Sequence, residues 1–120
     1  MEQVGHLTDL EPLWLGRLDD FQSGLEVLHA VDLENRATWD ADHNSCTVEA
    51  HLSDFRSLRQ ELVARATSMA SERPLVWALH PRFKQPMTVV DLAFFVAEHD
   101  DHHLAAITEL IGRFSPGAAV

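Results

Sequence analysis

The sequence predicts an all-α protein, a single antiparallel helical bundle. Three stretches of the chain carry apolar side chains at intervals of three or four residues, which is the period of a helix with one buried face. No run of alternating apolar and polar residues bounded by turn signals indicates a strand. At 120 residues and 46% hydrophobic composition, the chain is long enough for one core and too short for two domains.

The first helix is predicted from Gln3 to about Leu28. Pro12 interrupts this stretch, because it has no N–H to donate to the carbonyl of Thr8 and its ring clashes there. We expect either a kink at this point or a fresh helix start between Thr8 and Glu11. The apolar residues of the stripe are Val4, Leu7, Leu10, Trp14, Leu18, Phe21, Leu25 and Leu28.

A long crossover loop and a second helix are predicted next. Residues 29–46 contain few large apolar side chains and many Asp and Asn residues, which is typical of a loop. The helix follows from about Cys46 to Ala70, and either Ser45 or Thr47 can cap it. The apolar residues of its stripe are Val48, Leu52, Phe55, Leu58, Leu62, Ala66 and Met69.

The segment 72–87 is predicted to be extended. Its three prolines end helices and restrict the preceding residues to extended conformations. We expect Trp77, Leu79 and Phe83 to attach this segment to the core.

The last helix is predicted from Thr88 to about Phe114. Thr88, followed three residues later by Asp91, resembles a capping box, and Pro116 with Gly117 ends the helix. The apolar residues of its stripe are Val89, Leu92, Phe95, Val96, Ile107, Leu110 and Phe114.

The charge balance excludes direct nucleic-acid binding. Nine Lys and Arg residues against nineteen Asp and Glu give a formal net charge of −10, whereas binding to a phosphate backbone requires an excess of cations. No apolar run approaches the roughly 18 residues of a membrane span, and the first residues lack the pattern of a signal peptide. A single cysteine, Cys46, cannot form an internal disulfide. We therefore expect a cytoplasmic protein.

Eight histidines are the unusual feature of the composition. His99 and His103 continue the stripe of the last helix between Val96 and Ile107, so both face the core. Residues four apart on a helix lie about 6 Å apart on one face, which allows two imidazoles to bind one divalent cation at about 2.0–2.1 Å each. A metal would also satisfy two polar rings whose burial without partners costs about 1–3 kcal/mol. The alternative is a structural pair bonded to carbonyls or carboxylates.

A third ligand should come from another helix. His6 borders the buried arc of the first helix, and His51 borders the stripe of the second. On geometry alone the two are near-equal candidates. The less favourably placed histidines are His29, at the end of the first helix, and His43 and His80, in loops.

Four stretches of the chain are distinctive: HLTDLEPLWLGRLDDF at 6–21, DLENRATWDADHN at 32–44, FRSLRQELV at 55–63 and HPRFKQPMTVVDLAFFVAEHDDHHLAAITEL at 80–110. Together they resemble the DinB-like superfamily, which includes the DinB/YfiT metalloproteins; the histidine run in AEHDDHHL is the most specific element. The resemblance implies a four-helix bundle in which one histidine of helix two and two histidines of helix four hold a divalent metal. It implies His6, His99 and His103 as those ligands, in preference to His51.

The resemblance also implies that this single domain, residues 1–120, is truncated at its N-terminus. Members of the superfamily usually have another helix before the histidine that corresponds to His6, whereas only five residues precede it here. A three-helix remnant would expose an apolar groove, and large exposed apolar patches usually bind a partner. We expect a homodimer formed through this face. His6 would lie near a helix end that frays, which would weaken metal affinity.

Three neutral imidazoles with an open coordination position are typical of a catalytic metal, which lowers the pKa of bound water or of a coordinated thiol. Imidazole ligands suit Zn, Ni, Cu and Fe, of which we expect Zn or Ni. Superfamily members are similar in architecture to transferases and isomerases that use bacillithiol, mycothiol or glutathione. The resemblance thus implies a metal-dependent transferase acting with a low-molecular-weight thiol on an electrophilic substrate, or a hydrolase. Side chains that could orient ligands or move protons are Glu98, Asp100, Asp9 and His102.

The alternative function is that of a non-catalytic helical stress-response or interaction protein with a structural or vestigial metal site. The chain has no Gly-rich phosphate loop, no nucleophile elbow and no basic cluster that would hold an acidic thiol. Arg82 and Lys84 are the nearest approach to an anion site. We expect them to form a solvated loop surface instead.

Overall fold

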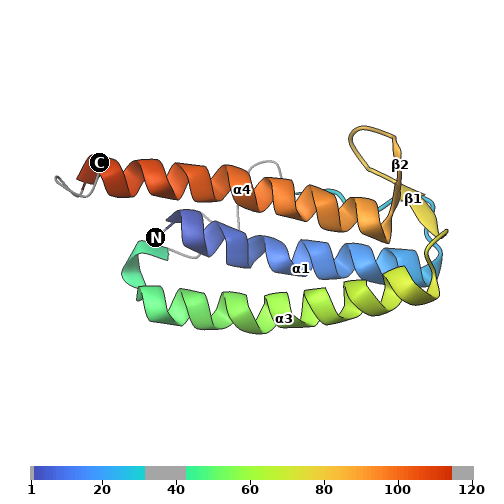
Figure 1. The fold of residues 1–120 in the computed structure, drawn as a ribbon, viewed down its shortest axis with the longest axis horizontal. Coiled ribbons are helices and arrows are strands. Elements are labelled where there is room, and N and C mark those ends of the chain that lie inside the picture. Colours follow the sequence, from blue (N-terminus) through green and yellow to red (C-terminus); the bar gives the residue numbers. More distant parts are fainter. Residues whose placement is uncertain (1, 32–42, 115–120) are drawn as a thin grey trace.

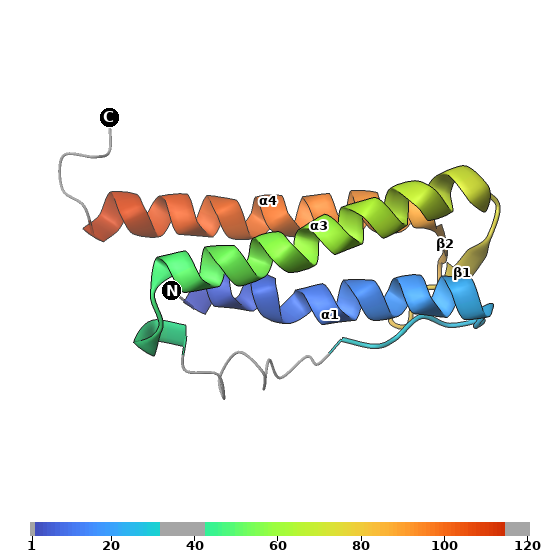
Figure 2. The ribbon, with the colours of Figure 1, turned by 90° about the horizontal axis from the view of Figure 1, so that it is seen from below.

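The structure, a computed structural model, describes residues 2–31 and 43–114. Its elements in chain order are α1 (Glu2–Ser23), the 3-10 turn η1 (His43–Ser45), α3 (Val48–Glu72), β1 (Trp77–Leu79), β2 (Pro86–Thr88) and α4 (Val89–Phe114). The three long helices lie lengthwise side by side, and α1 packs behind the pair formed by α3 and α4 (Figures 1 and 2). The predicted all-α fold class is confirmed.

Helices α1 and α3 lie parallel to each other in the bundle (Figure 1). In Figure 1, α1 and α3 run in the same direction and α4 runs in the opposite direction. Consequently α1 ends and α3 begins at opposite ends of the bundle, as a crossover requires. Residues 32–42 of the predicted crossover lie outside the described residues.

Helix α1 runs without interruption through Pro12, so the expected fresh start between Thr8 and Glu11 is wrong. The helix ends at Ser23 rather than near Leu28, because Gly24 adopts φ +72°. This left-handed conformation is the usual way in which a glycine ends a helix. Leu28 is nevertheless buried, since the chain beyond the helix turns back onto the core.

Side-chain caps fix the starts of the other two helices. Thr47 caps α3, because its Oγ1 accepts a hydrogen bond from the backbone N–H of Ala50 at 3.1 Å. At the start of α4, Thr88 donates its backbone N–H to Asp91 Oδ2 at 2.9 Å, and Asp91 donates its backbone N–H to Thr88 Oγ1 at 3.3 Å. The reciprocal bonds are those of a capping box. A cap of this kind stabilises a helix by about 1 kcal/mol.

A short hairpin that the sequence analysis did not predict connects α3 to α4. Strands β1 and β2 pair antiparallel with Ala78 opposite Met87. Successive side chains of a strand point to opposite faces, so Ala78 and Met87 face the core and are buried. Trp77 and Phe83 are 59% and 57% exposed, so the expectation that they attach this segment to the core is wrong.

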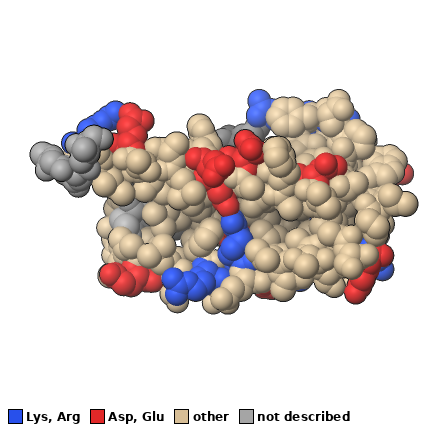
Figure 3. All heavy atoms as spheres, in the orientation of Figure 1, with Lys and Arg blue, Asp and Glu red and all other residues tan. Residues whose placement is uncertain are grey.

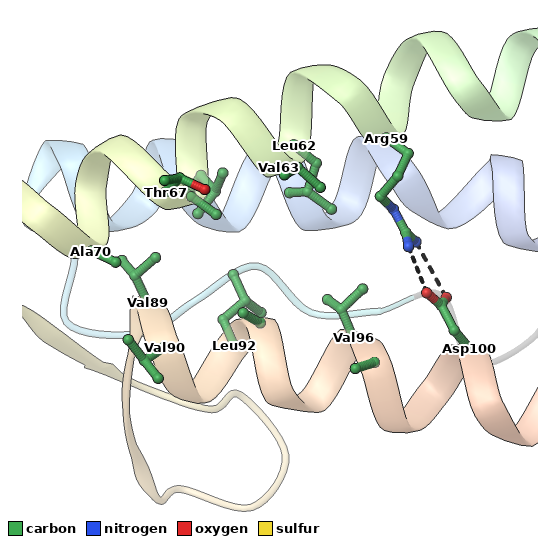
Figure 4. A pocket seen from close by; sticks show the side chains of 14 residues that line it. Arg59, Leu62, Val63, Thr67, Ala70, Val89, Val90, Leu92, Val96 and Asp100 are labelled. Carbon is green, nitrogen blue, oxygen red and sulfur yellow. Dashed lines mark hydrogen bonds and ion pairs between the residues drawn. The ribbon is translucent and has the colours of Figure 1, made fainter.

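An apolar groove runs between α3 and α4, with a volume of about 310 Å³. Its floor includes Leu18 of α1, and its walls include Val63 and Val90, which are 56% and 60% exposed. Figure 4 shows the ion pair of Arg59 and Asp100 at one end of this groove. The face seen in Figure 3 is largely uncharged, with acidic and basic side chains gathered in a band across its middle and at its edges. This α3–α4 groove is an apolar surface that the described residues leave uncovered.

Candidate metal centre

Three histidine side chains from two helices meet at one point of the bundle. His6 comes from α1, and His99 and His103 come from α4. One ring nitrogen from each lies within 4.8 Å of the other two. The ring centroids are 5.9 Å apart for His6 and His99, 4.8 Å for His6 and His103, and 4.5 Å for His99 and His103. Among the described residues, no other group of three or more His, Cys, Asp or Glu side chains is gathered in this way.

The helical positions explain the convergence. His99 and His103 lie one turn apart on the side of α4 that faces α1, so their rings are neighbours on one face of the helix, tilted at 51° to each other. Trp14, which is 3% exposed, packs the edge of its ring against His99 at a centroid distance of 5.5 Å. The buried indole limits the orientations that the His99 ring can adopt.

A hydrogen bond fixes the tautomer of His103. Its Nδ1 lies 2.6 Å from Oε1 of Gln3 on α1. An amide oxygen can only accept, so Nδ1 carries the hydrogen and donates it. The lone pair is then on Nε2, and metal-binding histidines are oriented in the same manner by a partner on the opposite ring nitrogen.

The ring of His99 has an unsatisfied polar atom. Its Nδ1 is buried and has no hydrogen-bond partner among the described residues. The pKa of His99 is lowered to about 4, mainly by burial and then by the neighbouring His103 and His6. The pKa of His103 is lowered as well, first by burial and then by His6. Both imidazoles are therefore neutral at pH 7, the form that binds a metal.

These observations agree with a divalent ion at the cluster. The donor set consists of three imidazoles, which suit Zn, Ni, Cu and Fe. A bound ion would give the buried Nδ1 of His99 a partner, and each zinc–nitrogen bond would measure about 2.0–2.1 Å. The cluster can hold a metal ion; that His6, His99 and His103 are its ligands stays a prediction.

Three other histidines, His29, His51 and His80, do not belong to the cluster. His51 is buried in α3 and does not belong to the group of converging nitrogens. His29 places its Nδ1 2.6 Å from Asp20 Oδ2. His80, which follows β1 and is buried, accepts a hydrogen bond on Nδ1 from the backbone N–H of Arg82 at 3.1 Å. The rings of His29 and His80 therefore have hydrogen-bond partners outside the group formed by His6, His99 and His103.

Of the four side chains considered for orienting ligands or moving protons, Asp100 has a clear structural role. Its carboxylate pairs with Arg59, with Nη1 to Oδ2 at 2.5 Å. Glu98 and His102 are exposed, and Asp9 is half-buried. The ring of His102 lies 5.5 Å from that of His103, at the rim of the cluster.

A cavity of about 260 Å³ reaches the cluster from the side of the hairpin. His6 and His99 form one end of it, and Arg17 and Arg82 also line it. Arg17, which is only 1% exposed, was not among the residues predicted from the sequence. Its signal was its position: three residues after Trp14, it places a charge on the apolar stripe of α1. Arg82 was expected on a solvated loop surface, and although it is exposed, it borders this cavity.

One of the three comparisons with known proteins found a match. The sequence model of the DinB superfamily matches residues 1–107. Neither the curated proteins nor the solved structures include a match. None of the helices that the structure describes has an apolar stretch long enough to cross a membrane. Because the match spans nearly the whole chain, this protein belongs to the DinB superfamily.

Proposed function

We propose that the protein is a cytoplasmic metal-dependent enzyme, a thiol transferase or a hydrolase, with one divalent ion held by His6, His99 and His103. The observation that carries this proposal is the cavity of about 260 Å³ that reaches His6 and His99. A structural metal site is usually closed by four protein ligands, whereas a catalytic site keeps a position open to substrate. Three converging imidazoles beside a cavity correspond to the second arrangement.

The chain's own residues would position the metal and exclude water. A bound Zn or Ni ion would act as a Lewis acid that lowers the pKa of a coordinated thiol or water. Gln3 holds the His103 ring through its Nδ1–H. Trp14 and Phe95 pack edge to face at 5.9 Å and form an apolar wall beside His99. The apolar wall lowers the local dielectric, which strengthens the electrostatic effect of the ion on a reacting group.

Turnover is expected to depend on the metal and on the histidine pair. If the protein is a thiol transferase, the zinc- or nickel-loaded form should convert a low-molecular-weight thiol and an epoxide to the thioether. If it is a hydrolase, the same form should hydrolyse an activated ester. The rate should fall to background after chelation and in His103→Ala. His102→Ala, which changes the neighbouring rim residue, should retain it. Equal rates before and after chelation would contradict the proposal.

The α3–α4 groove favours a second function, assembly through a partner helix. We propose that its occupant is a second copy of this chain. In a two-fold dimer each copy presents the same surface, so the exposed Val63 and Val90 of one copy would contact those of the other across the groove. Arg59, at the end of the groove, is already ion-paired with Asp100, so covering the groove does not bury an unpaired arginine.

The dimer is expected to be lost when a charge enters the groove. In sedimentation experiments across a hundredfold range of concentration, the wild type should shift from monomer to dimer. Val63→Glu should remain monomeric, because burying an unpaired carboxylate is costly. Leu75→Glu, at a position 87% exposed and outside the groove, is the matched control and should dimerise as the wild type does. A wild type that stays monomeric at every concentration would contradict the assembly.

A further inference from the structure

The buried guanidinium of Arg17 has an unused hydrogen-bond donor. The side chain is 1% exposed, and Nη1 has no hydrogen-bond partner among the described residues. Nε donates to the backbone carbonyl of His29 at 3.0 Å, which holds the group in place. Burial lowers the pKa of Arg17, and nearby Asp20 partly opposes this effect. A buried donor without a partner is rare in folded proteins and calls for a specific explanation.

Asp20, the carboxylate whose charge acts on Arg17, already has other hydrogen-bond partners. Asp20 Oδ2 accepts a hydrogen bond from the backbone N–H of His29 at 2.7 Å and lies 2.6 Å from the ring nitrogen of the same residue. None of the described residues that line the cavity is acidic, whereas two of them, Arg17 and Arg82, are cationic. In a chain with nine Lys and Arg against nineteen Asp and Glu, two arginines around one cavity without an acidic residue form a local site for an anion.

The rest of the cavity is apolar. The rings of Trp14, Phe83 and Phe95 line it, and the guanidinium of Arg17 lies 5.4 Å from the centre of the Trp14 ring. Its volume of about 260 Å³ is slightly below the usual range for ligand sites, so a bound molecule must be small. Inorganic phosphate would leave these aromatic walls without a contact. A small molecule with one anionic end and one apolar body would use both.

We propose that this cavity, lined by Trp14, Arg17, Arg82, Phe83, Phe95 and His99, binds a small organic acid, with its carboxylate on Nη1 of Arg17. The aromatic rings pack against the body of the molecule, and Arg82 adds a second positive charge at the rim. The far end of the ligand then lies toward His6 and His99. The assignment of this acid as the substrate rests on the proposed metal function, but its binding to Arg17 does not.

The test uses phenylacetate as the probe and metal-free wild-type protein. Calorimetry or ligand-detected NMR should show saturable binding of phenylacetate. Phenylacetamide, which has the same shape and no charge, should bind at least about tenfold more weakly, because a hydrogen bond to a charged group contributes about 1.5–3 kcal/mol. Inorganic phosphate, the third probe, should not compete at equal concentration.

Two variants locate the binding site. Arg17→Met should weaken phenylacetate binding at least about tenfold. Because Arg17 is buried and this variant can fail to fold, Arg82→Ala provides an independent measurement at an exposed position and should weaken binding about threefold. Lys84→Ala, on the same loop but outside the cavity, is the matched control and should bind as the wild type does.

Equal binding of the acid and the amide, competition by phosphate at equal concentration, absence of binding to the wild type, or full affinity in Arg82→Ala would each overturn the inference. Carboxylate binding by a protein that binds no metal would overturn the proposed function and leave the carboxylate site standing. Metal binding without discrimination between acid and amide would do the reverse.

Discussion

His99→Ala and His103→Ala proteins, purified without a histidine tag, are expected to contain almost no bound metal, whereas the wild type is expected to contain one ion per chain. Each variant leaves two of the three converging imidazoles. The protein ligands that remain cannot hold the ion against competing buffer and water, so affinity should fall by more than about 100-fold, beyond the loss typical of a changed outer partner. Elemental analysis after dialysis measures the stoichiometry, and calorimetry with Zn²⁺ measures the affinity.

The histidine-rich sequence supplies its own controls. His102→Ala removes an exposed imidazole beside His103 and should keep full stoichiometry. Gln3→Ala removes only the partner of the His103 ring and should weaken binding by roughly 10- to 100-fold without abolishing it. Unchanged stoichiometry in both His99→Ala and His103→Ala would eliminate the pair as ligands.

Arg59→Met is expected to lower the free energy of unfolding by about 3 kcal/mol, since it leaves a buried carboxylate without its cation. Glu11, on α1, is fully buried, and its Oε1 accepts a hydrogen bond from Arg59 Nε at 2.9 Å. Asp100 on α4 contacts the same guanidinium, so this one side chain of α3 ties the three long helices together. Burial raises the pKa of Glu11 and Arg59 lowers it, so without Arg59 the carboxyl group is protonated more readily. The melting temperature should fall by roughly 10 °C.

A second substitution distinguishes loss of charge pairing from loss of packing. Glu11→Leu combined with Arg59→Met removes the lone buried acid and should restore part of the stability, because an apolar pair of similar volume can replace a buried ion pair. Arg56→Ala, at an exposed position of the same helix, should change stability by less than about 0.5 kcal/mol. An Arg59→Met protein as stable as the wild type would show that the ion pairs of Arg59 contribute nothing to the free energy of unfolding.

The helices could be predicted because their signals are local. The apolar period gave the three long elements, and Thr47 and Thr88 with Asp91 act as caps where the sequence allowed them. The predicted end of the first helix is too late, because Leu28 continues the apolar stripe whereas the positive φ of Gly24 ends the helix earlier. Leu28 is buried through contacts with a distant part of the chain, since its backbone N–H donates to Leu79 O at 3.0 Å. A periodic pattern cannot distinguish these two ways of burying a residue.

Long-range pairing explains what the sequence did not reveal. The hairpin has strands of three residues each, too short for an alternating pattern to be recognised. Arg17 and Glu11 interrupt an apolar stripe, but their surroundings come from other elements: Arg59 on α3 for Glu11, and His29 beyond α1 for Arg17. For the candidate site, the spacing of His99 and His103 was sufficient to propose a pair. His6 could be preferred over His51 only through the family resemblance.

The most direct test of the central claim is X-ray absorption on the zinc-loaded protein. Three imidazole rings and one further oxygen or nitrogen donor, and no sulfur, should surround the ion, with Zn–N distances of about 2.0–2.1 Å. The imidazole contribution should drop to two rings in His6→Ala if this variant retains zinc at high metal concentration. A sulfur ligand from Cys46, or a spectrum unchanged by the loss of His6, would contradict the site described for α1 and α4.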